Sequence, residues 1–492
     1  MRHTLTRKVN YPIVLRMLGW LLMVEALFMF LPALVSWYYR EIGTVVAFLG
    51  TAFPALIIGA LMAYRIKPSS SSMNKREGLL LTSSVWVFFS LFGMVPFLVT
   101  GSLNTVTDAF FETIAAFTTT GSTIVQDVEV LPHGILFWRS LMQWLGGMGI
   151  ILFTLAVLPM LNYKGGITLF NAEVTGITHE RLRPRVNQTA KDLWLVYLGL
   201  TVLLTLLLLP AMGGFDAVCH SMSTMSTGGF STKNDSVGFW RSPYIAFVLM
   251  LFMFLGGVNF SLIYMAISGK FKKVWQSDVF KWYVRLIIIC SAVVFVRMVI
   301  VKFPGTNMER AIFSVFDVLS AMTSTGFPPM SVETQGEFIG MVLMVLMFFG
   351  GMAGSTSGGA KIDRLIVLIK NAKNELYRVL HPNTVTTVRI DGKALPFNRV
   401  STVIAFLSMY VIIVIVVALL LVMMNIPMFD ALYTSLSALS NLGVGYGITG
   451  ADGSWAVLPD AAKWLLALEM LVGRLELFTV LVLFTSTFWL RD

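Results

Sequence analysis

The sequence predicts an all-α, polytopic membrane protein with ten transmembrane helices, most of which belong to a fourfold internal repeat. Three observations predict this fold: the composition, ten long apolar stretches and four similar glycine-centred segments. Of 492 residues, 56% are hydrophobic and 13% are charged, and the mean hydropathy is +0.78. Soluble domains carry about 25% charged residues. The chain must therefore bury its apolar surface in a lipid bilayer.

Each transmembrane helix is predicted from an apolar stretch of about 20 residues, the length that crosses the hydrocarbon core of a bilayer. The ten stretches are 17–37, 44–64, 78–100, 134–161, 192–213, 241–268, 282–303, 337–370, 400–424 and 460–489. The first follows a basic segment that has no small-residue cleavage site. We therefore expect a retained span rather than a signal peptide.

Four shorter segments lie between these spans, and each is too short and too polar to cross the bilayer. They are 107–120, 215–227, 311–325 and 429–442. We expect them to be re-entrant half-helices, because interrupted helical structure at membrane depth is tolerated where it is buried in protein or lines a wet cavity.

The distribution of basic residues predicts the orientation. Of 36 Lys and Arg residues, 27 lie in the segments 1–16, 65–77, 163–191, 269–285 and 361–399 and at Arg491. By the positive-inside rule these segments and both termini face the cytoplasm, and the half-helices enter from outside. The net charge of +10 is dispersed over all inner loops. That dispersion argues against a nucleic-acid partner.

A unit of span, half-helix, loop and span occurs four times. The loop segments 117–123 (FTTTGST), 225–231 (MSTGGFS), 323–328 (TSTGFP) and 440–445 (SNLGVG) align on Gly121, Gly228, Gly326 and Gly443, at separations of 107, 98 and 117 residues. The predicted repeats are 78–161, 192–268, 282–370 and 400–489. Residues 1–65 stand outside the repeat and are expected to form an accessory two-helix hairpin.

Two further sequence features recur at corresponding positions in the repeats. Asp108, Asp216 and Asp430 precede the aligned glycine by 12 or 13 residues, where we expect them to cap the half-helix and to favour its positive dipole end. The second spans carry LGGM at 145–148, LGGV at 255–258, FGGM at 349–352 and VGRL at 472–475. Close helix packing explains the paired glycines of the first two motifs.

Four such loops around one axis would line a pore with main-chain carbonyls. Rings of carbonyls replace the hydration shell of an ion, and glycine reaches backbone angles closed to other residues. The half-helix C-termini direct partial negative charge into the pore. The four loops contain no charged residue, which argues against divalent-cation and anion pores. They favour a monovalent cation, potassium before sodium.

The predicted selectivity filter comprises Thr119, Thr120, Gly121, Ser122, Ser226, Thr227, Gly228, Gly229, Ser324, Thr325, Gly326, Phe327, Asn441, Leu442, Gly443 and Val444. Potassium is expected to bind at Thr119, Thr120, Gly121, Ser226, Thr227, Gly228, Thr325, Gly326, Leu442 and Gly443.

The loops, the glycine-rich break in the third repeat and the ending GRLELF at 473–478 resemble the Trk/Ktr/HKT superfamily of potassium uptake proteins over essentially the whole chain. The chain is most similar to the bacterial Trk-type pore subunits. This resemblance implies a potassium-channel-like fold in the bacterial inner membrane, with potassium as transported ion and no organic cofactor. It also implies a homodimer and a TrkA-like ring of cytosolic nucleotide-binding regulatory subunits.

Within that resemblance, Gly121 favours potassium over sodium. The strand at Asn441, Leu442 and Gly443 departs most from a potassium-channel filter. It therefore predicts only moderate selectivity.

Segment 350–361 (GGMAGSTSGGAK) interrupts the second span of the third repeat with five glycines. Each interior glycine costs about 1 kcal/mol relative to alanine, so we predict a mobile gating loop in preference to a tolerated kink. The predicted gate comprises Gly350, Gly351, Gly354, Ser355, Thr356, Ser357, Gly358, Gly359, Lys361 and Arg474.

The charged residues near this break have alternative roles. Arg474 takes the glycine-pair position in the fourth repeat. It either pairs with Glu476 or projects towards the axis, where its permanent charge repels cations. Lys361 and Arg364 are expected to extend to the inner interface, although Lys361 could assist the gate.

An enzyme is disfavoured, because the five histidines form no pair at metal-binding or acid–base spacing. His220 is expected to pack or to form hydrogen bonds inside the second half-helix. An ion-coupled secondary transporter remains the alternative function, since broken helices serve such folds too. Those folds usually have two related halves, whereas this sequence has four similar quarters.

Overall fold

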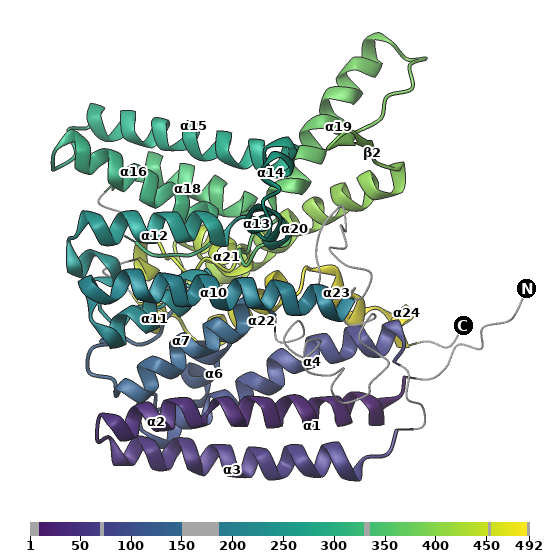
Figure 1. Ribbon diagram of the computed structural model, residues 1–492. Coiled ribbons are helices and arrows are strands. Elements are labelled where there is room, and N and C mark those ends of the chain that lie inside the picture. The colour runs from purple at the N-terminus through teal and green to yellow at the C-terminus, as the bar shows by residue number, and fades with distance from the viewer. Residues whose placement is uncertain (1–8, 69–72, 150–185, 329–334, 451–453, 490–492) are drawn as a thin grey trace, which may run out of the picture.

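The computed structural model describes residues 9–68, 73–149, 186–328, 335–450 and 454–489, and these segments are predominantly helical (Figure 1). Six helical segments of the described chain are long and apolar enough to cross a membrane. They are α1 (Tyr11–Phe28) with α2 (Phe30–Tyr38), α3 (Ile42–Arg65), α4 (Lys75–Gly93) with α5 (Val95–Val99), α10 (Val186–Met212), α15 (Asp278–Ile300) and α20 (Phe397–Met423). They coincide with six of the ten predicted spans, and the total of ten stays a prediction.

The second helix of each repeat is shorter than predicted. These helices are α7 (His133–Gly147), α12 (Pro243–Gly256), α18 (Glu337–Phe349) and α22 (Asp460–Arg474), of 15, 14, 13 and 15 residues. At 1.5 Å per residue each is about 20 Å long, less than the hydrocarbon core requires. All four end at or just before the motif that carries the glycine pair or Gly473 and Arg474.

The segments after these short helices correct the continuous spans predicted at 241–268 and 460–489. After α12 the chain bends by 108° into α13 (Phe260–Ile267). After α22 it forms only α23 (Phe478–Leu481), a 3₁₀ turn at Val482–Phe484 and α24 (Ser486–Trp489). The predicted break in 337–370 is present, because α18 ends at Phe349 and α19 (Ile362–Leu380) begins after the loop. The end of the predicted span 134–161 lies outside the described residues.

Four half-helices lie between the first and second helices of the repeats: α6 (Val106–Phe117), α11 (Gly214–Met225), α16 (Asn307–Met322) and α21 (Met428–Leu439). Each packs against the first helix of its own repeat and the second helix of the preceding one. Thus α7 packs on α11, α12 on α16, α18 on α21, and α22 returns to α6. This last contact closes the four repeats into a ring.

The shared spacing of the three aspartates has a different cause from the predicted capping. Thr105 is the N-cap of α6 and accepts a hydrogen bond from the amide of Asp108 at 3.0 Å, while Asp108 pairs with Lys463 at 2.7 Å. Asp216 accepts from the Thr232 hydroxyl at 2.7 Å, and Asp430 accepts from the Ile448 amide at 3.1 Å. All three lie in the first helical turn, near the positive dipole end, but their carboxylates hold other segments.

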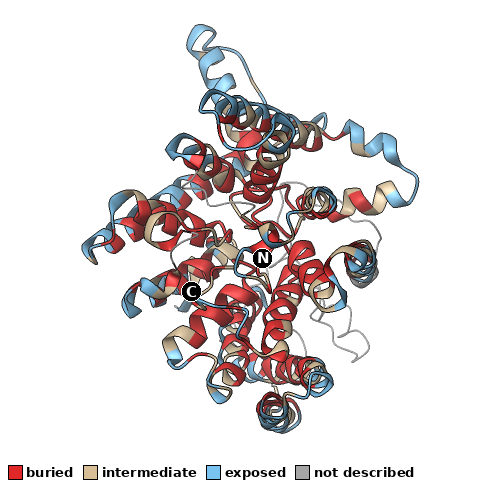
Figure 2. Ribbon diagram, turned by 90° about the vertical axis from the view of Figure 1, so that its left-hand side faces the viewer, coloured by how far each residue is buried: buried red, intermediate tan, exposed pale blue. Residues whose placement is uncertain are grey.

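The outer faces of the helices are apolar, as a bilayer requires. On α15, Ile288, Ile289 and Ile300 are 63%, 58% and 66% exposed, whereas the buried residues gather at the centre of the molecule (Figure 2). The first three helices pack together beside α4 and α7. Glu41 joins them to α7 by accepting hydrogen bonds from the amides of His133 at 2.7 Å and Gly134 at 3.1 Å.

Shorter elements complete the described chain. In Figure 1, α19 and a two-stranded hairpin project from the same end of the molecule at which α1 begins. The remaining elements are α14 (Phe271–Gln276), the strands β1 (Arg389–Ile390) and β2 (Lys393–Ala394), and 3₁₀ turns at Ser236–Trp240, Gly447–Thr449 and Trp455–Val457.

Candidate functional site

The loops after the four half-helices meet in a closed ring. If a Cβ atom were added to Gly121, Gly229, Gly326 and Gly443, it would lie 1.9, 2.2, 2.1 and 2.1 Å from the carbonyl oxygens of Gly228, Thr325, Leu442 and Thr120, respectively. Each glycine therefore touches a carbonyl of the following repeat, and the fourth repeat touches the first. This contact leaves no room for a side chain at any of the four glycines.

The backbone conformation corrects the predicted alignment of the second repeat. Positive φ angles of 50° to 56° occur at Thr119, Thr227, Ser324 and Asn441, and angles of 77° to 80° at Gly121, Gly229, Gly326 and Gly443. The residues between them, Thr120, Gly228, Thr325 and Leu442, donate their amides to the carbonyl five residues earlier. Gly229, not Gly228, is thus the equivalent of Gly121. The interval from Asp108, Asp216 and Asp430 then becomes 13 residues in all three repeats.

The predicted filter residues all lie in these four loops. Most are buried, but the four positive-φ glycines are partly exposed. Those glycines are therefore the points at which the ring meets accessible space. Asn441 also links neighbouring loops, because its Nδ2 donates to the Thr120 hydroxyl at 2.9 Å.

The loop 350–361 lies against the C-terminal ends of three half-helices. The Thr356 hydroxyl donates to the carbonyl of Met225 at 3.1 Å, and the Gly358 amide donates to the Ser324 hydroxyl at 2.5 Å. The Gly359 amide donates to the carbonyl of Ser440 at 2.9 Å. The predicted gate residues of this loop are thus placed directly beside the ring, with contacts in the second, third and fourth repeats.

The bend between α12 and α13 also holds this loop, which the sequence did not reveal. The Met352 amide donates to the carbonyl of Gly257 at 2.9 Å, and Asn259 Nδ2 donates to the carbonyl of Ala353 at 2.7 Å. The motif Gly256-Gly257-Val258-Asn259 carried a signal for the bend, since a glycine pair followed by a capping residue is typical of one helix ending and another beginning.

Arg474 joins the loop to the first repeat. Its guanidinium donates to the carbonyl of Thr356 at 3.0 Å and to the carbonyls of Gly146 at 2.6 Å and Gly147 at 3.0 Å. Glu476 pairs with Arg364 at 2.5 Å. Glu476 thus has Arg364 as an ion-pair partner, and the hydrogen bonds of Arg474 given above go to main-chain carbonyls.

Lys361 is buried, which corrects the expectation that it reaches the inner interface. Its ammonium group donates to the carbonyl of Ser357. Lys361 consequently belongs to the folded loop. Arg364 is also largely buried, and its guanidinium lies 3.9 Å from the centre of the Phe406 ring.

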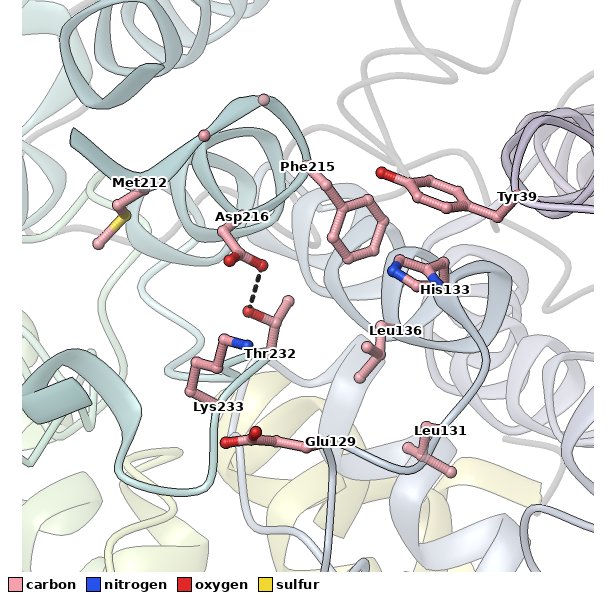
Figure 3. Close-up of a pocket in the computed structure, with 12 residues that line it drawn as sticks. Tyr39, Glu129, Leu131, His133, Leu136, Met212, Phe215, Asp216, Thr232 and Lys233 are labelled. Atoms are coloured by element: carbon pink, nitrogen blue, oxygen red, sulfur yellow. Dashed lines mark hydrogen bonds between the residues drawn. The ribbon is translucent and has the colours of Figure 1, made fainter. Parts of the chain in front are cut away.

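A cavity of about 340 Å³ lies apart from the ring, where the first helices meet α7 and α11 (Figure 3). Tyr39 stacks on His133 with ring centroids 3.8 Å apart, and Asp216 accepts the Thr232 hydroxyl in its wall. Its lining residues do not include any predicted filter or gate residue. The cavity therefore lies outside the candidate site formed by the ring and the loop 350–361.

Comparison with known proteins adds to this geometry. The family model for TrkH, described as a cation transport protein, matches residues 45–489. The chain is 38% identical to the Trk system potassium uptake protein TrkH of Salmonella typhimurium, with 98% of this chain and 100% of the relative covered. It is 32% identical to TrkG of Escherichia coli, with 97% of this chain and 98% of that relative covered.

A solved structure has the same fold. The crystal structure of the potassium transporter TrkH from Vibrio parahaemolyticus matches with a TM-score of 0.88 and 33% identity, covering 98% of this chain and 100% of that one. A match of this extent includes the hairpin as well as the four repeats. The chain therefore belongs to the TrkH family of cation transport proteins.

Proposed function

We propose that this protein takes up potassium ions across the bacterial cytoplasmic membrane through the ring of four loops. The observation that carries the proposal is the closed set of glycine-to-carbonyl contacts, which brings four uncharged main-chain strands together around one axis. Main-chain carbonyls can replace the hydration shell of a monovalent cation. The printed names of the relatives, which are Trk system potassium uptake proteins, support potassium as the ion.

We further propose that the loop 350–361 and Arg474 close this path in the conformation described. The hydrogen bonds from the loop to three repeats, and from Arg474 to the first repeat, support a closed layer beside the ring. Opening the path requires the loop to move and the guanidinium to leave these carbonyls. The energy for that movement is proposed to come from cytosolic nucleotide-binding subunits, with two pore subunits forming a homodimer whose termini face the cytoplasm.

The proposal is tested by reconstituting the purified protein in liposomes under opposed potassium and sodium gradients. We expect a reversal potential displaced towards the potassium equilibrium potential, and a larger flux when the cytosolic partner is present. A reversal potential that does not change with the potassium gradient would contradict potassium selectivity.

An ion-coupled secondary transporter is the second candidate, and the bend of 108° between α12 and α13 favours it, since broken helices form the binding sites of such proteins. Unitary currents in a planar bilayer would support the channel. Potassium movement that requires a proton or sodium gradient would support the transporter.

A further inference from the structure

The second helix of the first repeat carries two polar side chains where the other three repeats are apolar. Arg139 and Gln143 precede Gly146 by seven and three residues, and both are buried. The residues in the same register before Gly256, Gly350 and Gly473 are also buried, and they are Leu249, Met253, Leu343, Met347, Leu466 and Met470. The first repeat thus departs from an otherwise uniform pattern at two positions that face the ring.

Gln143 binds the loop of the second repeat from behind. Its Nε2 donates to the carbonyl of Gly228 at 2.6 Å, and its Oε1 accepts from the Ser223 hydroxyl at 2.8 Å and the Phe230 amide at 3.2 Å. The Phe230 amide can only donate, so it fixes which end of the amide side chain faces Gly228. Gly228 carries one of the four carbonyls of the ring, the one that lies against Gly121.

Arg139 binds the segments that follow the loops of both repeats. Its Nε pairs with Glu112 at 2.9 Å, and one terminal nitrogen donates to the Thr123 hydroxyl at 3.0 Å. The other terminal nitrogen donates to the carbonyl of Ser231 at 3.3 Å, and the guanidinium carbon lies 4.0 Å from the centre of the Phe230 ring. One side chain therefore connects the first half-helix to the strands that leave the ring in two repeats.

The second half-helix adds a contact of the same kind. His220 and Glu112 both lie nine residues before their ring glycine. His220 Nε2 lies 3.0 Å from the Ser231 hydroxyl, and Nδ1 lies 2.9 Å from the carbonyl of Asp216. Since a carbonyl only accepts, Nδ1 carries the proton and Nε2 accepts from Ser231 in the neutral ring. This confirms the expected hydrogen-bonding role of His220.

In the other two repeats the same positions lack this arrangement. Asp317 and Thr434 are the residues nine before Gly326 and Gly443, but the residues two after those glycines are Pro328 and Gly445, which have no side-chain donor. This pairing of a residue nine before the ring glycine with one two after it therefore occurs in the first and second repeats, whereas Ser320 and Ser437 hold the other two loops by donating to the carbonyls of Phe327 and Val444.

We propose that Gln143 and Arg139 are positioning residues that hold the Gly228 side of the ring at a fixed distance from the axis, and thereby set the discrimination between potassium and sodium. A smaller cation needs closer oxygens, and a loop that Gln143 holds from behind at Gly228 and Phe230 cannot advance towards it. This inference rests on the proposed function, and it adds that ion selectivity is controlled from the Gly228 side of the ring.

The test is Gln143→Met, which gives the first repeat the residue found at this position in the other three. The hydrogen bonds of Gln143 to Gly228, Phe230 and Ser223 are lost, the one to the ring carbonyl of Gly228 among them, so we expect the potassium-to-sodium permeability ratio to fall roughly threefold to tenfold, while gel filtration in detergent shows the same elution as for the wild type. Met253→Leu, a conservative change at the equivalent apolar position, is the matched control and should keep the wild-type ratio.

A second variant covers the case in which Gln143→Met does not fold. Glu112→Gln with Arg139→Met removes the ion pair without leaving a buried charge unpaired, and its ratio should fall in the same direction. If either folded variant keeps the wild-type ratio, the positioning role assigned to that side chain is overturned. If the wild type itself shows no potassium-selective flux, the proposed function fails, and this inference fails with it.

Discussion

At the scale of single residues, the four ring glycines combine a left-handed backbone with a close main-chain neighbour. Gly229 combines a φ of +79° with a carbonyl of the next repeat 2.2 Å from where a Cβ would be. Gly228 has no positive φ, and a Cβ there would meet the Gln143 side chain at 2.5 Å. A main-chain oxygen in a closed ring has much less freedom to move than a side chain.

We predict that Gly229→Ala lowers potassium flux in liposomes more than Gly228→Ala does. The left-handed backbone costs a residue with a Cβ about 1–2 kcal/mol, and the overlap with the Thr325 carbonyl adds to this. The measurement is the potassium flux of both variants, compared at equal amounts of reconstituted protein. Equal losses, or a larger loss at Gly228, would contradict the register found in the structure.

The sequence predicted the ring but misplaced one strand by a single residue, because two adjacent glycines in the second repeat fit the motif equally well. The interval of 13 residues from Asp216 could have separated them. Arg474 was found because a charge within a predicted span is costly. Arg139 is likewise a charged residue inside a predicted span, 134–161, and Glu112 is a charged residue inside a predicted half-helix. They pair with each other within the first repeat, and Arg139 also contacts Ser231 and Phe230 of the second repeat, contacts that a linear pattern does not reveal.

At the scale of elements, the loop 350–361 is stabilised by its contacts rather than by regular hydrogen bonding. It connects two helices, and its amides and hydroxyls bind the ends of α11, α16 and α21. Arg474 binds it from the end of α22. Because these partners belong to separate repeats, moving the loop breaks several contacts together.

We predict that Arg474→Ala raises the basal leak of potassium or rubidium from liposomes roughly tenfold, since each hydrogen bond from a charged group contributes about 1.5–3 kcal/mol. Arg474→Lys should leak less than Arg474→Ala, because an ammonium group keeps the charge but not the planar fork of donors.

The matched control is Arg378→Ala, which removes an arginine from an exposed pair with Glu375 on α19 and should leave the leak at the wild-type level. An unchanged leak in Arg474→Ala would exclude a closing role for this side chain.

Hydropathy predicted the first helices of the repeats well and the second helices poorly. Apolar residues continue through Gly256 and Gly257, so a window of composition joins α12 to α13 across their bend of 108°. The bend depends on contacts between Gly257, Asn259 and the loop of another repeat. The broken span of the third repeat was predicted because five glycines in twelve residues are incompatible with a helix.

At the scale of the whole molecule, four repeats form a ring that is closed by contacts between the first and the fourth. Lys463 on α22 is buried and pairs with Asp108 on α6 at 2.7 Å. Trp464 stacks on Phe110 with centroids 4.8 Å apart. These contacts join the last repeat to the first, just as α7, α12 and α18 each join their repeat to the next by packing on its half-helix.

We predict that Asp108→Asn lowers the stability of the detergent-purified protein by about 1–3 kcal/mol, because it leaves the ammonium group of Lys463 poorly paired in a buried site. Asp460→Asn is the control, since Asp460 lies 3.7 Å from the same ammonium group but is 72% exposed. Its effect should be about 0.5 kcal/mol or less. Equal shifts in the midpoint of thermal unfolding for the two variants would show that the buried pair at the ring closure contributes no more to stability than the exposed pair.

The pairing of Lys463 with Asp108 also constrains how the protein is made. The two residues are 355 positions apart, and a ribosome synthesises the first repeat long before the fourth leaves it. During that interval α6 lacks the helix α22, which packs against it in the complete protein. Under the proposed function, the nascent chain therefore has no closed ring through which ions could pass until α22 reaches α6, and by that time the loop 350–361 has already been synthesised.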